Sequence, residues 1–252
     1  MRNNWFTITA FALLSFASSC KDNRYYTKED FAKVKKADTH THIYLESSAM
    51  ADQAIADNFY LLDVQFEEYS YMPLPRQAAF AQYQIKHFPG RIGWVTAFST
   101  IGFDQPGWTG KTITQLQKDF DNGAVGVKIW KNIGMKLRDS SGKFVMVDDA
   151  RFDSVIHFIV HAGKTVMGHL GEPKNCWLPI DSMTVINDQH YYTGNPEYHM
   201  FLHPDYPSYE QQVRARDHLL EKNPDMVFVG AHLGSLEWNI DSLAAHFDRY
   251  PN

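Results

Sequence analysis

The sequence predicts an α/β protein built as a (β/α)8 TIM-type barrel, with about six of the eight βα units present. Short apolar runs alternate with amphipathic segments along the chain, which is typical of parallel strands joined by crossover helices. Two of these runs end in His-Leu-Gly, at His169 and His232, and an earlier run carries His40 and His42. Histidines at the C-terminal ends of buried strands favour a barrel whose site lies at that face.

The first 20 residues are set apart from this fold. Arg2, the apolar run 5–16 and the small residues before Cys20 are typical of a secretory signal. The place of Cys20 resembles the bacterial lipoprotein box, although an aliphatic residue is usual where Ala17 stands. We therefore expect a lipoprotein signal peptide at 1–20 and an exported chain, lipid-anchored to a bacterial membrane on its periplasmic or outer-surface side. An ordinary cleaved signal is the alternative.

The barrel domain is assigned to 21–252, and its elements follow from periodicity and from turn residues. Helices end at Pro89-Gly90, at Asn122-Gly123 and before Gly163, while Pro73 and Pro75 mark a loop. Strands are expected at 36–43, 59–64, 92–98, 124–130, 165–171 and 227–234. Helices are expected at 26–35, 49–58, 77–87, 112–121, 152–161 and 208–221, with one more after His232.

A doubly wound open sheet is the alternative architecture, but no glycine-rich phosphate loop follows the first strand. The barrel is preferred, and two further βα units would be needed to close it. The sequence therefore looks like a C-terminally truncated barrel. A barrel left open exposes strand edges and apolar surface, which is unfavourable for a soluble monomer.

The pair His40 and His42 suggests a metal site, because residues two apart on a strand point to the same side. Neutral imidazoles suit zinc, and manganese is a second choice. The net charge of −5 and the absence of a basic cluster argue against nucleic acid as a partner. Cys176 is the only cysteine besides Cys20, so a disulfide framework is not expected. Oligomeric state is not predicted.

A family resemblance rests on four motifs in order. They are His40-Thr41-His42, Gly126-Val127-Lys128-Ile129-Trp130, Gly168-His169-Leu170-Gly171-Glu172-Pro173 and Gly230-Ala231-His232-Leu233-Gly234. Together they resemble the amidohydrolase superfamily, specifically amidohydrolase family 2, from about Lys36 to the C-terminus. The resemblance implies that His40, His42 and His169 bind a divalent metal. It also implies that His232 binds a second metal or orients substrate.

The aspartate that the family places after its eighth strand has no counterpart in this sequence. Lys128 has three possible roles. It bridges two metals, binds a substrate carboxylate, or pairs with an acid for structural reasons. Glu172 is expected as a catalytic proton shuttle or a substrate anchor, with a solvated loop acid as the alternative. Lys131 and Arg138, in the exit loop of the fourth strand, are expected to bind substrate.

These features predict a metal-dependent hydrolase that acts on a small amide, ester or lactone through a metal-activated water. A metal-dependent decarboxylase of the same fold is the second hypothesis. The third is a non-catalytic lipoprotein that binds a ligand through the tyrosine-rich connection Tyr191 to Tyr209. Substrate, metal identity and the number of metals are not fixed by the sequence.

Overall fold

The computed structural model describes residues 25–68 and 70–252. The strands are β1 Lys36–Thr41, β2 Phe59–Val64, β3 Ile92–Ala97, β4 Ala124–Ile129, β5 Thr165–Gly168 and β6 Phe228–Gly230. The α-helices are α2 Ala49–Ala56, α3 Leu74–His87, α4 Trp108–Asp121, α5 Asn132–Met135, α6 Asp153–His161, α7 Ile186–Gly194, α8 Tyr209–Lys222, α9 Ala231–Gly234 and α10 Ile240–Arg249. The expected signal peptide at 1–20 lies outside the described residues.

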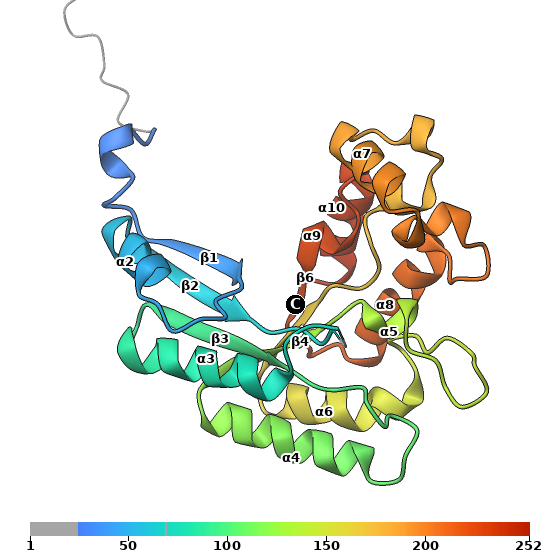
Figure 1. Ribbon diagram of the computed structural model, residues 1–252, viewed down its shortest axis with the longest axis horizontal. Coiled ribbons are helices and arrows are strands. Elements are labelled where there is room, and N and C mark those ends of the chain that lie inside the picture. Colours follow the sequence, from blue (N-terminus) through green and yellow to red (C-terminus); the bar gives the residue numbers. More distant parts are fainter. Residues whose placement is uncertain (1–24, 69) are drawn as a thin grey trace, which may run out of the picture.

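The six strands form one parallel sheet whose order follows the sequence, β1-β2-β3-β4-β5-β6. A doubly wound sheet would reverse its order at a switch point, whereas this sheet never does. Helices α3, α4 and α6 cover one side of the sheet, which curls around the opposite side (Figure 1). The predicted incomplete (β/α)8 barrel is confirmed.

The main core lies between the sheet and its covering helices. It is formed by buried strand residues such as Trp94 and Val127 and by Leu116, Ile156 and Leu219 from α4, α6 and α8. The inner side of the sheet is lined by a smaller cluster, Val64, Val95 and Met167. Strands that are apolar on both sides suit a barrel wall, and β3 is buried along its whole length.

Two predicted elements differ from the structure. The helix expected at 26–35 is wrong, because only a 3-10 turn at Lys28–Asp30 forms there. That turn buries no residue, and a short helix without an apolar face to bury is marginal. The loop expected at Pro73 and Pro75 is also shorter than predicted. Helix α3 already begins at Leu74, so Pro75 lies in its first turn, where a missing N–H is harmless.

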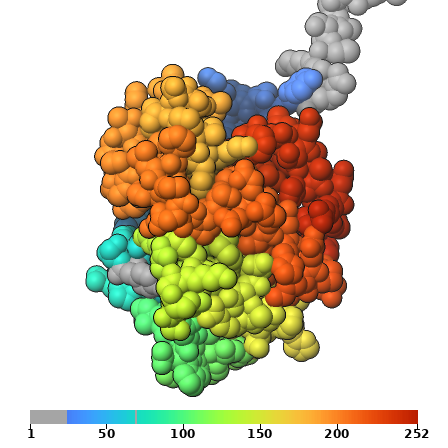
Figure 2. All heavy atoms as spheres, turned by 90° about the vertical axis from the view of Figure 1, so that its right-hand side faces the viewer, coloured from blue at the N-terminus to red at the C-terminus, as the bar shows by residue number. Residues whose placement is uncertain are grey.

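The long connection after β5 contains structure that the sequence did not predict. It holds α7 and four 3-10 helices at Lys174–Trp177, Ile180–Ser182, Pro196–Tyr198 and Met200–Leu202. Cys176, Met183, Tyr192 and Met200 give it a small core of its own. In Figure 2 this gold and orange segment lies above the lime-green excursion 131–149 that follows β4.

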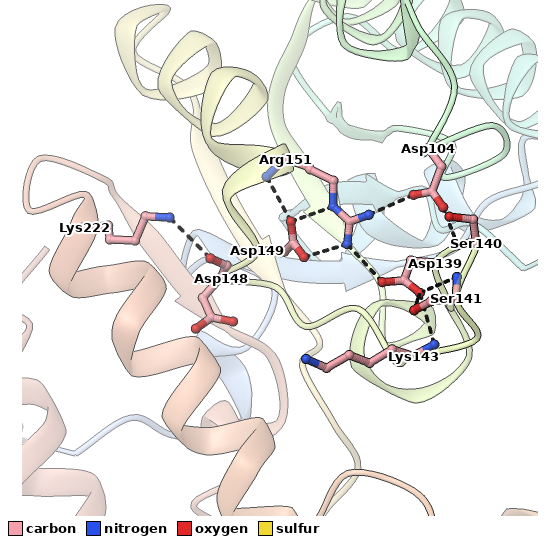
Figure 3. A network of polar contacts seen from close by, with 9 residues as sticks. All are labelled: Asp104, Asp139, Ser140, Ser141, Lys143, Asp148, Asp149, Arg151 and Lys222. Atoms are coloured by element: carbon pink, nitrogen blue, oxygen red, sulfur yellow. Dashed lines mark hydrogen bonds and ion pairs between the residues drawn. The ribbon is translucent and has the colours of Figure 1, made fainter.

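The excursion 131–149 is held on the barrel in part by Arg151. The Arg151 guanidinium lies 2.9 Å from Asp104, 2.8 Å from Asp149 and 3.8 Å from Asp139 (Figure 3). Asp139 also accepts hydrogen bonds from the backbone N–H groups of Ser141 and Lys143, which closes the turn at the tip. This network helps to fix the segment that carries Lys131 and Arg138.

A search of residues 25–68 and 70–252 for helices that could cross a bilayer found none of sufficient length and apolarity.

Candidate functional site

Four histidines from three separate parts of the sequence meet at the C-terminal ends of the strands. His42 directly follows β1, His169 directly follows β5, and His232 lies in the turn after β6. The ring centroids are 5.2 Å apart for His40 and His42, 5.9 Å for His40 and His232, and 4.6 Å for His169 and His232. The structure thus brings together the four strand-end histidines that the sequence singled out.

The turn that carries His232 is conformationally unusual. His232, Leu233 and Ser235 all have positive φ, at 53°, 54° and 61°. Each such non-glycine residue is unfavourable by about 1 kcal/mol or more. The chain accepts this conformation at the point where it turns the His232 ring toward His169 and His40.

All four imidazoles are held in the neutral form that a metal ligand requires. Burial lowers the pKa of His169 to about 4, because the ring is almost entirely enclosed. Burial, followed by the charge of Lys128, lowers the pKa of His40 to about 4. The pKa values of His42 and His232 are lowered as well, again mainly by burial.

His169 gives the clearest sign that the site takes a ligand. Both of its ring nitrogens are buried, and neither has a hydrogen-bond partner among the described residues, although a Glu172 carboxylate oxygen lies 3.5 Å from Nε2. A buried polar group without a partner is unfavourable by about 1–3 kcal/mol. An ion bound at His169 would satisfy one of these nitrogens, so this donor set fits a borderline divalent metal.

The nitrogens are nevertheless not arranged as a finished coordination shell. Within the described ranges, no group of three or more His, Cys, Asp or Glu side chains has its donor atoms at metal-ligand spacing. Assignment of His40, His42 and His169 as ligands therefore stays a prediction.

Lys128 lies at the centre of the cluster. Its side chain projects from β4, is 1% exposed, and places Nζ 3.3 Å from Nε2 of His40. Burial lowers the pKa of Lys128 to about 8. No carboxylate forms an ion pair with Lys128 within the described chain. The interpretation that Lys128 forms a purely structural ion pair therefore finds no support here.

Glu172 and Lys131 form an ion pair at the rim of the site. Burial acts to raise the pKa of Glu172, but His169 and Lys131 outweigh it and lower the pKa to about 2. Oε2 of Glu172 lies 3.5 Å from Nε2 of His169. A carboxylate with so low a pKa is a weak proton shuttle near neutral pH, so this geometry suits an orienting role better.

Aromatic side chains line the site beside the histidines. Phe66 lies 5.3 Å from His42, 4.7 Å from Trp130 and 5.3 Å from Tyr71, on which it stacks. Trp130 in turn meets the edge of His169 at 4.8 Å, and Tyr44 lies 5.7 Å from His42. We call these four residues, Tyr44, Phe66, Tyr71 and Trp130, the aromatic wall.

Two buried acids near the site were not predicted. Asp63 in β2 accepts the Ile43 N–H at 2.8 Å, and burial raises its pKa to about 7. Glu67 accepts hydrogen bonds from Thr100 and Asn132, which joins the loops after β2, β3 and β4. An acid inside the apolar run 59–64 was a visible signal for Asp63. Glu67 gave no such signal, because its partners Thr100 and Asn132 are 33 and 65 residues away in the sequence.

Arg138 is not brought to the histidines. Its guanidinium lies 3.6 Å from the centre of the Phe144 ring and donates a hydrogen bond to the Gly142 carbonyl. The tyrosines of the connection Tyr191 to Tyr209 also differ in exposure. Tyr192 and Tyr209 are buried, whereas Tyr191 and Tyr198 are about half exposed. Substrate binding by Arg138 stays a prediction.

Comparisons with known proteins found similarity in structure only. No family model matches the chain, and no curated protein matches it. The solved structures that it matches include amidohydrolase-family structures. One is an amidohydrolase II structure with a TM-score of 0.49 and 14% identity, over 86% of this chain and 73% of that one.

Two further matches are more distant. A 2,6-dihydroxybenzoate decarboxylase from Rhizobium has a TM-score of 0.47 and 14% identity, over 81% of this chain and 59% of that one. An amidohydrolase from Mycobacterium avium subsp. paratuberculosis has a TM-score of 0.39 and 13% identity, over 81% of this chain and 53% of that one. The chain thus spans from about half to about three quarters of the length of these structures.

Proposed function

We propose that the chain is a metal-dependent hydrolase of a small amide, ester or lactone. One observation carries the proposal: four neutral imidazoles converge at the strand ends, and the buried ring nitrogens of His169 have no hydrogen-bond partner among the described residues, the Glu172 carboxylate lying 3.5 Å from Nε2. His40, His42 and His169 would hold the ion, which is zinc or, as second choice, manganese. When bound, such an ion polarises a carbonyl and makes a coordinated water acidic.

The surrounding side chains have separate tasks in this proposal. His232 is neutral and exposed beside His169, so its free nitrogen can accept a proton or orient the substrate. Glu172 holds Lys131 at the rim, where the ammonium can bind an anionic part of the substrate. The aromatic wall supplies an apolar surface that excludes water from one side.

A metal-dependent decarboxylase is the second candidate, and the aromatic wall favours it. Phe66 and Trp130 give a planar ring a surface to stack on, beside His42 and His169. The Lys128 ammonium lies next to His40, where it could bind a carboxylate. An aromatic acid would use both features, whereas a simple ester or lactone would use only the first.

Metal content tests the proposal. The chain from Lys21 is purified, and zinc and manganese are measured by elemental analysis beside a His40→Ala, His42→Ala variant. The matched control is His157→Ala, His161→Ala, which removes two exposed histidines four residues apart on α6. We expect about one ion per chain in the wild type and in the control, with loss in the first variant. Equal metal in all three proteins would contradict the site.

A substrate panel then separates the two reactions. Ester and lactone hydrolysis is measured against carbon dioxide release from aromatic acids, in wild type and in Lys128→Met. Hydrolysis that survives Lys128→Met, without carbon dioxide release, supports the hydrolase. Carbon dioxide release that Lys128→Met abolishes supports the decarboxylase.

We also propose that the mature protein is exported and lipid-anchored through Cys20, on the basis of the signal-like composition of residues 1–20. The test is fractionation of cells that express wild type or Cys20→Ser. Membrane association that the substitution abolishes would support the anchor, and equal partitioning of the two proteins would contradict it.

A further inference from the structure

The turn after β6 stays in the left-handed helical conformation for four consecutive residues. The backbone φ angles of His232, Leu233, Gly234 and Ser235 are 53°, 54°, 61° and 61°. Residues with a Cβ visit this region singly and not in runs, because the Cβ lies too close to the following carbonyl oxygen. This turn therefore needs support from outside itself.

Two side chains of α8 bind the carbonyl groups at the end of this turn. Nη1 of Arg216 donates to the Gly234 carbonyl, and the Tyr209 hydroxyl donates to the Ser235 carbonyl. Tyr209 and Arg216 are seven residues apart, so they lie on the same face of the helix. Both residues are buried, with 5% and 4% exposure, which shields these hydrogen bonds from water.

Each of the two donors is itself fixed by another partner. Arg216 binds Oδ1 of Asp217 through Nε at 3.0 Å and through Nη2 at 2.8 Å, and Oδ2 of Asp217 lies 3.0 Å from Nε2 of His246 on α10. The Tyr209 hydroxyl accepts the Trp238 indole N–H at 2.7 Å, so its own proton is free to go to the turn. A planar guanidinium held at Nε and Nη2 presents Nη1 in one direction.

The turn packs closely at both of its ends. A Cβ atom at Gly234 would lie 3.0 Å from Nη1 of Arg216, and a Cβ atom at Gly230 would lie 2.9 Å from the Gly234 Cα. His232 lies between these two glycines in the chain, and its ring centroid is 4.6 Å from that of His169. The direction of the turn therefore determines where the His232 ring lies.

We propose that Arg216 and Tyr209 are positioning residues for His232. By binding the carbonyls of Gly234 and Ser235, they keep the turn left-handed and the His232 ring beside His169. This inference rests on the proposed function, in which His232 accepts a proton or orients the substrate. The two residues act through the backbone of the turn and not on the reacting atoms.

The test reads the position of the His232 ring by NMR on metal-free, histidine-labelled protein. We expect a cross-relaxation peak between the ring protons of His169 and His232 in wild type, because these rings are in contact. The peak between His40 and His42, whose centroids are 5.2 Å apart at the end of β1, is the internal reference. The substitutions His232→Gln and His42→Gln identify the two peaks.

Arg216→Met should lose the His169–His232 peak and keep the reference. Arg216→Lys, which retains a donor for the Gly234 carbonyl, should keep part of the peak. Tyr209→Phe removes only the hydroxyl and should weaken the peak, so it decides the matter if Arg216→Met does not fold. Arg214→Met is the matched control: it removes an exposed arginine from the same helix and should behave as wild type.

An unchanged His169–His232 peak in Arg216→Met and in Tyr209→Phe would overturn the inference. Equal loss of both peaks in Tyr209→Phe would overturn it as well, because the two residues would then support the fold as a whole.

This inference and the metal centre fail separately, because the rings are read without metal. A wild type that binds no zinc, but whose His169–His232 peak depends on Arg216, supports the positioning role and overturns the metal centre. A wild type that binds zinc, with a peak that neither substitution changes, overturns the positioning role and leaves the metal centre standing.

Discussion

Nζ of Lys128 lies 3.3 Å from Nε2 of His40, so a buried amine occupies the space in front of a nitrogen that would bind the metal. The charge of Lys128 opposes a second positive charge at His40, since it contributes to the low pKa of His40. A metal ion at His40 must therefore be accommodated beside this amine, and the amine must either lose its proton or move.

Lys128→Met should strengthen zinc binding at pH 7. The pKa of Lys128 is about 8, so the amine is mostly charged at pH 7, and a unit charge at about 4 Å is worth on the order of 4 kcal/mol at an effective dielectric of 20. We expect at least about tenfold tighter zinc binding in the variant. The advantage should shrink above pH 8, where wild-type Lys128 becomes neutral. Zinc titration at several pH values measures it, and weaker binding in the variant would instead favour Lys128 as a bridge between two metals.

The histidines of this site could be predicted because their signals are local. His40 and His42 are two residues apart, and His169 and His232 each end an apolar run. A short stretch of sequence therefore shows both the histidine and its position at a strand end. Because the strands are parallel, their C-terminal ends then lie at the same end of the sheet. The fold class followed from the same alternation.

The supporting residues could not be predicted in this way. Arg216 in α8 meets Gly234 in the turn beyond β6, and Glu67 meets Asn132 across three strands. Neither contact produces a periodic pattern of residues in the sequence. The segment after β5 was missed for another reason: its 3-10 helices are stabilised by a small local core around Cys176 and Tyr192, and such short pieces leave no periodic signal.

Glu67→Ala should destabilise the protein strongly, by about 3 kcal/mol or more. The Glu67 carboxylate is buried and accepts from the Thr100 N–H, the Thr100 hydroxyl and Asn132 Nδ2 at 2.7 to 2.9 Å, so its removal breaks the hydrogen bonds that join the loops after β2, β3 and β4. Urea unfolding measures the change. The neighbour Glu68 pairs with the partly exposed Lys136, and Glu68→Ala should change stability by less than about 1 kcal/mol. Similar losses in both variants would contradict a special role for Glu67.

Asp63→Asn should remove a pH dependence of stability. Burial raises the pKa of Asp63 from its ordinary value near 4 to about 7, so the folded protein favours the protonated carboxyl. This contribution is fully present below pH 4 and is lost as the pH rises toward 7. Wild type should therefore lose stability relative to Asp63→Asn between pH 4 and pH 8, by an amount on the order of a few kcal/mol. Urea unfolding across this range measures both proteins, and parallel profiles would show that Asp63 does not titrate in this interval.

The outer face of α10 should drive self-association. Ile240, Leu243 and Phe247 are spaced at i, i+3 and i+7, as on one face of a helix, but no residue of Ile240–Arg249 is buried in the described structure. Val229, on the neighbouring strand β6, is 40% exposed, and β6 pairs only with β5 among the described strands. An apolar helix face beside an open sheet edge promotes association between chains. Ile240→Glu with Phe247→Glu should lower light scattering at a given concentration. Ile186→Glu on α7 replaces a similarly exposed isoleucine outside this face and should leave scattering unchanged; an equal effect of both changes would mean that general charge, and not the α10 face, controls association.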